Sequence, residues 1–367
     1  MTATAVRTSG STTSTSTGDA SLPTVEAPAG HAVGFGVARD WSGVIDMLAE
    51  QLGSYYIDAD VAERVTTVLR QRLAVGGYEA ITDDEAFAEA VTADTVAASR
   101  DQHLRLRYSV AALPLLDTPV VPDSGRHPDE AALAGHGLAR VARLPGNVGI
   151  VDIRRFFPAR SSGHAVVAAM QLVAATDVLL IDLRQCPGGE PDMVALVSSY
   201  LFDERTELNR LHFPAEDRTI QWWTDPFVPG PVFGGKKPVY VLLGSQSYSA
   251  AEGFSYDLQQ RGRAVLVGEP TATGVAYFDY RYRVSDHLMF SVPSGRVVNP
   301  VSGRSWAPDG VQPDIRVDAA RALDTAYALA LRHTLSLGSD GHRRSVADEA
   351  RQALTRLEDA AMSPPSG

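Results

Sequence analysis

The sequence lacks several patterns that mark whole classes of protein. Among its 367 residues there is one cysteine, Cys186, so no disulfide can form within the chain. No run of about 20 apolar residues is present to cross a bilayer. The Ser/Thr-rich first 18 residues have no apolar segment of the kind found in secretory leaders. We therefore expect a cytoplasmic protein with no membrane partner.

Clustered positive charge and clustered metal-binding side chains are also missing. The net charge is −11, and 21% of the residues are charged against 44% hydrophobic. An acidic surface repels phosphate backbones, so nucleic acid is not an expected partner. No His, Cys or Asp cluster has ligand spacing, and no Gly-rich phosphate loop opens a helix. We expect no metal and no cofactor.

Composition and periodicity divide the chain into four segments. Residues 1–34 form a low-complexity tail that is too polar to bury a core. Residues 35–98 carry apolar side chains at helical spacing, which predicts a small helical module. Residues 99–338 form the predicted α/β domain, and residues 339–367 are predicted as a C-terminal helix and a loose end.

Apolar runs alternate with amphipathic stretches through most of the α/β segment. Continuous apolar strands separated by helices are typical of a mostly parallel sheet covered on both faces. Residues 110–138 are rich in Pro, Asp and Gly and predict a long loop, whereas residues 276–298 carry hairpin signals. The strands expected in the sheet are 148–153, 178–183, 239–243 and 264–267, and the helices are 165–173, 191–201, 250–260 and 319–335.

The strand predicted at 239–243 leads directly into small polar residues and then a helix. Open α/β sheets bind ligands at the carboxyl ends of their strands. A serine at a helix start also lies beside orphan N–H groups that stabilise a developing oxyanion. We therefore predict Ser249 as a serine nucleophile. The alternative is structural, because Ser247 and Ser249 with Glu252 also fit a capping box.

Two further segments carry groups that a serine nucleophile needs. Gly188 and Gly189 follow the strand at 178–183, and paired glycines let backbone N–H groups turn toward a bound oxygen. His103 lies at a strand start and offers a general base. A tight turn explains the glycines equally well, and His103 is one of nine histidines, each of which has a structural alternative.

Short motifs in a fixed order link these segments. Each motif alone is weakly specific, but the ordered set is specific. The motifs are Tyr78-Glu79-Ala80-Ile81-Thr82-Asp83, Asp101-Gln102-His103-Leu104, Leu144-Pro145-Gly146-Asn147-Val148-Gly149, Ile181-Asp182-Leu183-Arg184 with Gly188-Gly189, Ser249-Ala250-Ala251-Glu252, Leu266-Val267-Gly268-Glu269-Pro270-Thr271, Val298-Asn299-Pro300-Val301-Ser302-Gly303 and Gly310-Val311-Gln312-Pro313-Asp314.

This order, from about residue 47 to 315, resembles the C-terminal-processing (tail-specific) serine peptidase family. The likeness is greatest to the branch that includes the interphotoreceptor retinoid-binding protein repeats and the tricorn core domain. The resemblance implies a ClpP/crotonase-like α/β fold, with Ser249 as nucleophile and His103 as general base. It also implies an oxyanion hole made by Gly188 or Gly189 with the Ala250 N–H.

The sequence departs from this family at several positions. Gly274 stands where many members carry a catalytic lysine, so a Ser–Lys dyad is excluded there. Ala307 follows Trp306, where the histidine branch has a glutamate that organises the base. Asp309 is the proposed substitute, and Gln102 and Ser247 are further candidates for supporting residues.

Two other differences bear on substrate choice and on the nucleophile. Cys186-Pro187 alters the family's oxyanion loop, although no motif supports Cys186 as a nucleophile. Residues 109–140 are too few to hold the PDZ module that is common in the lysine-type members. We therefore predict a domain without a PDZ module.

The sequence leaves three functions open. The first is a serine hydrolase that cleaves short peptides through an acyl-enzyme on Ser249. The second is another acyl transfer on a small acyl substrate, such as ester or thioester hydrolysis or ring closure of a metabolite. The third is a non-catalytic carrier of apolar ligands, as in retinoid-binding relatives. A homo-oligomer is compatible with each of them.

Overall fold

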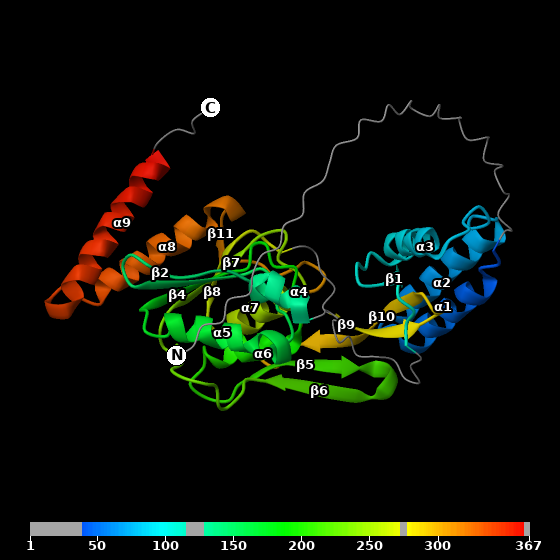
Figure 1. Cartoon of the computed structure of the whole chain (residues 1–367), viewed down its shortest axis with the longest axis horizontal. Coiled ribbons are helices and arrows are strands. Elements are labelled where there is room, and N and C mark those ends of the chain that lie inside the picture. The colour runs from blue at the N-terminus through cyan, green and yellow to red at the C-terminus, as the bar shows by residue number, and fades with distance from the viewer. Residues whose placement is uncertain (1–38, 115–127, 272–276, 363–367) are drawn as a thin grey trace, which may run out of the picture. The chain divides into compact units, whose positions relative to one another are not determined.

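The computed structural model describes residues 39–114, 128–271 and 277–362 (Figure 1). The predicted tail at 1–34 and the position Gly274 lie outside these ranges. The helices are α1 (Ser42–Tyr55), α2 (Ala59–Ala74), α3 (Asp84–Ser99), α4 (Pro128–Leu133), α5 (Ala159–Val173), α6 (Pro191–Ser199), α7 (Ala250–Gln260), α8 (Ala319–Ser336) and α9 (Arg344–Met362). The strands are β1 (Arg105–Tyr108), β2 (Leu138–Leu144), β3 (Val148–Ile153), β4 (Val178–Asp182), β5 (Glu207–Phe213), β6 (Arg218–Trp223), β7 (Val239–Leu243), β8 (Val265–Gly268), β9 (Tyr277–Arg283), β10 (Leu288–Val298) and β11 (Ile315–Arg316).

A six-stranded sheet with the order β11-β8-β7-β4-β3-β2 forms the larger part of the fold. Its neighbours pair in parallel from β11 to β3, and only β2 at the edge is antiparallel. The fold is therefore a mixed α/β fold with a mostly parallel sheet. Because parallel strands point the same way, the segments that follow β3, β4 and β7 emerge at one edge.

Helices cover both faces of this sheet, as the continuous apolar strands require. Helices α5, α6 and α7 lie on one face of the sheet and α8 and α9 lie on the other (Figure 1). The apolar side chains of each set form a separate cluster with the strands. Neighbouring residues of one strand divide between the faces: Leu179 and Ile181 join the first cluster, and Val178 and Leu180 join the second.

A second, antiparallel sheet has the order β1-β10-β5-β6, with β9 also paired to β10. Its apolar face packs against α1, α2 and α3 in a separate core that includes Trp41, Phe87 and Phe290. Helix α2 is capped by Asp58, whose side chain accepts a hydrogen bond from the Val61 N–H at 3.1 Å. Asp83 caps α3 in the same way.

Several predicted elements are corrected by the structure. The β5–β6 hairpin was not expected, and the predicted loop at 110–138 contains α4 and ends where the edge strand β2 begins. Helix α5 begins at Ala159, six residues before the predicted start. Strands β3 and β7 and helix α7 have the predicted bounds.

Candidate functional site

Ser249 occupies a strained turn between strand β7 and helix α7. It is the N-cap of α7, with φ 55° and ψ −116°, a backbone conformation that residues other than glycine rarely adopt. The residue is half-buried, so its side chain is partly accessible to solvent. A serine on a sharp, strained strand-to-helix turn is a known way to present a nucleophilic hydroxyl.

Glu252 holds this turn from inside the protein. Its Oε2 accepts a hydrogen bond from the Ser249 N–H at 2.7 Å, and its Oε1 accepts one from the Thr271 hydroxyl at 2.6 Å. The Thr271 hydroxyl in turn accepts the Val311 N–H at 2.8 Å. Burial raises the pKa of Glu252 to about 7, against the opposing effects of the Thr271 hydroxyl, the Ser249 N–H and the nearby His103. Glu252 therefore supplies its half of the capping box that the sequence suggested at this turn.

The glycine loop after β4 lies directly against the turn. A Cβ placed on Gly188 would lie 2.8 Å from the Ala250 nitrogen and 2.9 Å from the Ser249 Cβ. The Tyr248 N–H also donates to the Cys186 carbonyl at 3.1 Å, which joins the two loops. Only glycine leaves room in front of the Ala250 amide, as an oxyanion site requires.

Gly189 has a different environment from Gly188. It forms a bridge with Phe156, and a Cβ there would lie 2.0 Å from the Phe156 carbonyl oxygen. Gly189 therefore packs against the backbone of Phe156, whereas Gly188 packs against the turn that carries Ser249.

Cys186 is buried below this loop, and burial raises the pKa of its thiol to about 12. A thiol is a weak nucleophile while it is protonated. The Cys186 thiol is therefore a poor candidate for a nucleophile.

His103 comes from the segment that leads into β1 and stacks on Tyr248, the residue before Ser249. The two ring centroids are 5.1 Å apart, and the His103 Nδ1 lies 3.2 Å from the Tyr248 hydroxyl oxygen. Nδ1 also lies 3.4 Å from an oxygen of Asp101. Within the described part of the chain, the buried Nε2 atom has no hydrogen-bond partner. No hydrogen bond joins His103 to Ser249 among these residues, although such bonds are often long in proteins without substrate.

The predicted supporting residues lie in less direct positions. The Ser247 hydroxyl is buried, donates to the Leu183 carbonyl at 2.8 Å and accepts the Gly244 N–H, so it ties the two loops together. The Gln102 side chain is bonded to Arg105. Asp309 is exposed, and its backbone carbonyl accepts a bond from the Gln312 side chain.

Sequence reasoning did not select the acids that the structure places with the predicted pair. These acids are Asp101, beside His103, and Glu252, beneath Ser249. The spacing Asp-x-His and the capping box were visible signals, but neither pattern says which groups meet in space.

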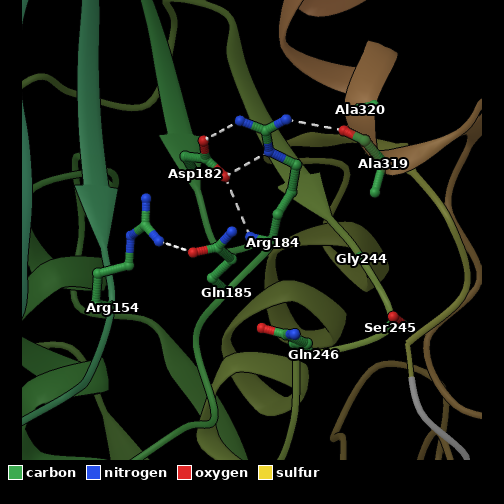
Figure 2. Close-up of a pocket in the computed structure, with 9 residues that line it drawn as sticks. All are labelled: Arg154, Asp182, Arg184, Gln185, Gly244, Ser245, Gln246, Ala319 and Ala320. Atoms are coloured by element: carbon green, nitrogen blue, oxygen red, sulfur yellow. Dashed lines mark hydrogen bonds and ion pairs between the residues drawn. The ribbon is translucent and has the colours of Figure 1, made fainter.

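A polar cavity of about 260 Å³ opens at the same edge of the sheet (Figure 2). Arg184 forks onto Asp182 with bonds of 2.9 and 2.7 Å, and Arg154 pairs with Asp152 and contacts Gln185. Paired charges make the cavity polar with little net charge. Its lining residues are Arg154, Asp182, Arg184, Gln185, Gly244, Ser245, Gln246, Ala319 and Ala320.

The described residues contain no group of three His, Cys, Asp or Glu side chains arranged to hold a metal ion. They also contain no helix with both the length and the apolar character needed to cross a membrane.

Solved structures share the architecture at low sequence identity. A lipoprotein from Streptococcus agalactiae is 12% identical with a TM-score of 0.54, and a candidate peptidase from Parabacteroides merdae is 16% identical with a TM-score of 0.53. Each match covers 79% of this chain and 96% of that chain. Mature CPAF is 13% identical with a TM-score of 0.50, over 88% of this chain and 98% of that chain. At these identities the likeness is one of fold.

Comparison with family profiles is more specific. Residues 147–317 match peptidase family S41, and residues 36–132 match the N-terminal domain of peptidase S41 in eukaryotic IRBP. The two matched regions contain Ser249 and His103, respectively. The chain belongs to peptidase family S41.

Proposed function

We propose that this protein is a serine peptidase that cleaves peptides through an acyl-enzyme on Ser249. The strained turn at Ser249, packed against Gly188 and the Ala250 amide, is the observation that carries the proposal. Membership of family S41 supports a serine peptidase.

In the proposed reaction the Ser249 hydroxyl attacks the substrate carbonyl carbon while His103 Nε2 accepts its proton. The carbonyl oxygen becomes an oxyanion, which the Ala250 N–H and a glycine N–H of the 188–189 loop stabilise. His103 then gives the proton to the leaving amine, and an ester remains on Ser249. Water attacks this ester with the same base, which releases the acid product and restores the hydroxyl.

The proposed substrate is a short peptide. The cavity in Figure 2 supports this because its amide, hydroxyl and guanidinium groups suit the hydrogen-bonding groups of a peptide better than an apolar ligand. Ser249 and His103 are not among its lining residues, but Gln185 belongs to the loop that carries Gly188, and Ser245 and Gln246 belong to the loop that leads to Ser249. We further propose the cytoplasm as location and the boundary near residues 98–99 as the division between helical module and catalytic domain.

The test is covalent labelling with a serine-reactive fluorophosphonate, followed by peptide mapping. We expect label on Ser249 in the wild type, none in Ser249→Ala, and a rate lowered at least 10²-fold in His103→Ala because the general base is lost. Ser161→Ala, near the start of α5, is the matched serine control and keeps the wild-type rate. Full labelling or peptide hydrolysis in Ser249→Ala would refute the proposal.

The same experiment separates the other functions. Label on Ser249 without hydrolysis of a peptide library, but with turnover of a small ester or thioester, would indicate another acyl transfer. Absence of label together with a co-purified lipid would indicate a carrier.

A further inference from the structure

We infer that Asp101 is the positioning residue of His103, in place of the acid that the family resemblance puts at the position of Ala307. This inference rests on the proposed roles of Ser249 and His103. It assigns to the N-terminal matched region both the general base and the carboxylate that orients it.

The Asp101 carboxylate is held on several sides. Its side chain is 1% exposed. Oδ1 accepts the His103 backbone N–H at 2.8 Å, and Oδ2 accepts the Tyr56 hydroxyl at 3.0 Å. The Asp101 N–H donates to the Ser99 hydroxyl at 3.0 Å. A buried carboxylate with these bonds has little freedom to move, so the Oδ1 atom stays 3.4 Å from the His103 Nδ1.

This placement favours one tautomer of His103. An ionised carboxylate only accepts hydrogen bonds, so its presence beside Nδ1 favours the proton on that atom. The lone pair is then on Nε2, which is the buried atom without a partner in the described residues. A general base needs this free lone pair, and the same carboxylate stabilises the imidazolium that forms after proton transfer.

Other groups around His103 do not replace Asp101. The Tyr248 hydroxyl is 3.2 Å from Nδ1 but is uncharged in its ordinary form. Glu252 lies near His103, but its oxygens accept the Ser249 N–H and the Thr271 hydroxyl. Asp309, the substitute expected from the sequence, is exposed to solvent.

The bond from Tyr56 gives helix α1 a part in the site. Tyr56 is the C-cap of α1, and its hydroxyl reaches Asp101 from there. The segment that contains α1 therefore supports His103 through one chain of contacts, from Tyr56 to Asp101 to His103.

The test uses Asp101→Asn in the full chain, with fluorophosphonate labelling of Ser249 as the rate assay. We expect the labelling rate to fall by up to a factor on the order of 10⁴, the loss seen when the orienting carboxylate of a Ser-His-Asp triad becomes an amide. Tyr56→Phe keeps the charge and loses one bond, so its rate falls only about fivefold.

Histidine-selective ¹⁵N NMR provides a readout that does not depend on activity. The wild type should show neutral His103 protonated on Nδ1, and Asp101→Asn should show a mixture or the other tautomer. His103→Gln assigns the signal. Asp94→Asn is the matched control, because Asp94 is also bound by a tyrosine hydroxyl, at 2.6 Å from Tyr78, within the helical region.

An unchanged rate and an unchanged tautomer in a folded Asp101→Asn would overturn this inference, even while Ser249→Ala abolishes labelling. Equal losses of rate in Asp94→Asn and Asp101→Asn would also overturn it, since both changes would then act through stability. Continued labelling in Ser249→Ala would instead refute the proposed function.

Discussion

At the scale of single residues, the serine turn needs glycine in front of it. Gly188 has φ +94°, and its missing side chain leaves the space next to the Ala250 amide open. Ser249 itself has positive φ, and the bond from its N–H to Glu252 holds it there. Backbone strain of this kind costs about 1–3 kcal/mol and persists only where surrounding contacts determine it.

The substitution Gly188→Ala tests this view of the loop. Its Cβ would lie 2.6 Å from the Tyr248 carbonyl oxygen and 2.8 Å from the Ala250 nitrogen. We expect the fluorophosphonate labelling rate to fall by about 10²-fold or more, because the oxyanion donor is displaced. Gly262→Ala is the control: this residue also has positive φ, +62°, but nothing lies within 4 Å of its Cβ. A wild-type labelling rate in Gly188→Ala would show that the loop does not form the oxyanion site.

At the scale of elements, a buried polar cluster joins helix α7 to the second sheet. The Asp257 carboxylate on α7 accepts bonds from Asn209 of β5 at 2.6 Å and from Asn299, just after β10, at 2.9 Å. Burial raises the pKa of Asp257 to about 7, while both asparagines lower it. The hairpin and the helix that carries Ser249 at its start are therefore linked through one side chain.

Replacement of Asn209 by alanine should loosen this link. One buried oxygen of Asp257 loses its donor, which typically costs about 1–3 kcal/mol. We expect the free energy of unfolding to fall by that amount, which a urea denaturation series measures. Gln221→Ala in strand β6 removes a bond to Glu207 on the exposed side of the hairpin and should change the free energy of unfolding by less than about 0.5 kcal/mol. Equal effects of the two changes would contradict the role of the cluster.

At the scale of the whole molecule, two buried carboxyl groups couple stability to pH. Glu252 and Asp257 both have pKa values raised to about 7 by burial, from ordinary values of 4.5 and 3.8. Between these values the folded protein binds protons that the unfolded chain releases. Their contribution to stability is therefore complete below about pH 4 and is lost as pH rises through 7.

Stability curves at several pH values give the measurement. Between pH 4.5 and 8 the wild type should lose up to about 3 kcal/mol of its free energy of unfolding through the titration of Glu252. Glu252→Gln should not show this loss, because it lacks the titrating group. Asp257→Asn should likewise lack the loss that comes from Asp257. Each substitution also changes the free energy of unfolding by an amount that does not depend on pH. The test is therefore the slope of the free energy of unfolding against pH, compared between variant and wild type. Parallel pH dependences for variant and wild type would contradict the raised pKa values.

The elements that the sequence predicted best are those with strong local signals. Strands β3 and β7 are mostly apolar and mostly buried, and α7 begins at a capping box, so their bounds followed from the residues. Strand β2 at the sheet edge has no fully buried residue and therefore little periodic signal. The β5–β6 pairing shifts register between Glu207 and Asn209, which interrupts the alternation that marks a strand.

The sequence by itself determined the candidate pair Ser249 and His103, the glycine loop, and the α/β class, because each follows from local pattern or motif order. Only the tertiary structure decided which groups surround them. Tyr248 and His103 are 145 positions apart and meet because the second sheet and the loops of the first sheet pack together. The acids Asp101 and Glu252 gain their places from the same packing, since contacts between distant segments depend on burial and chain path and leave no periodic trace in the sequence.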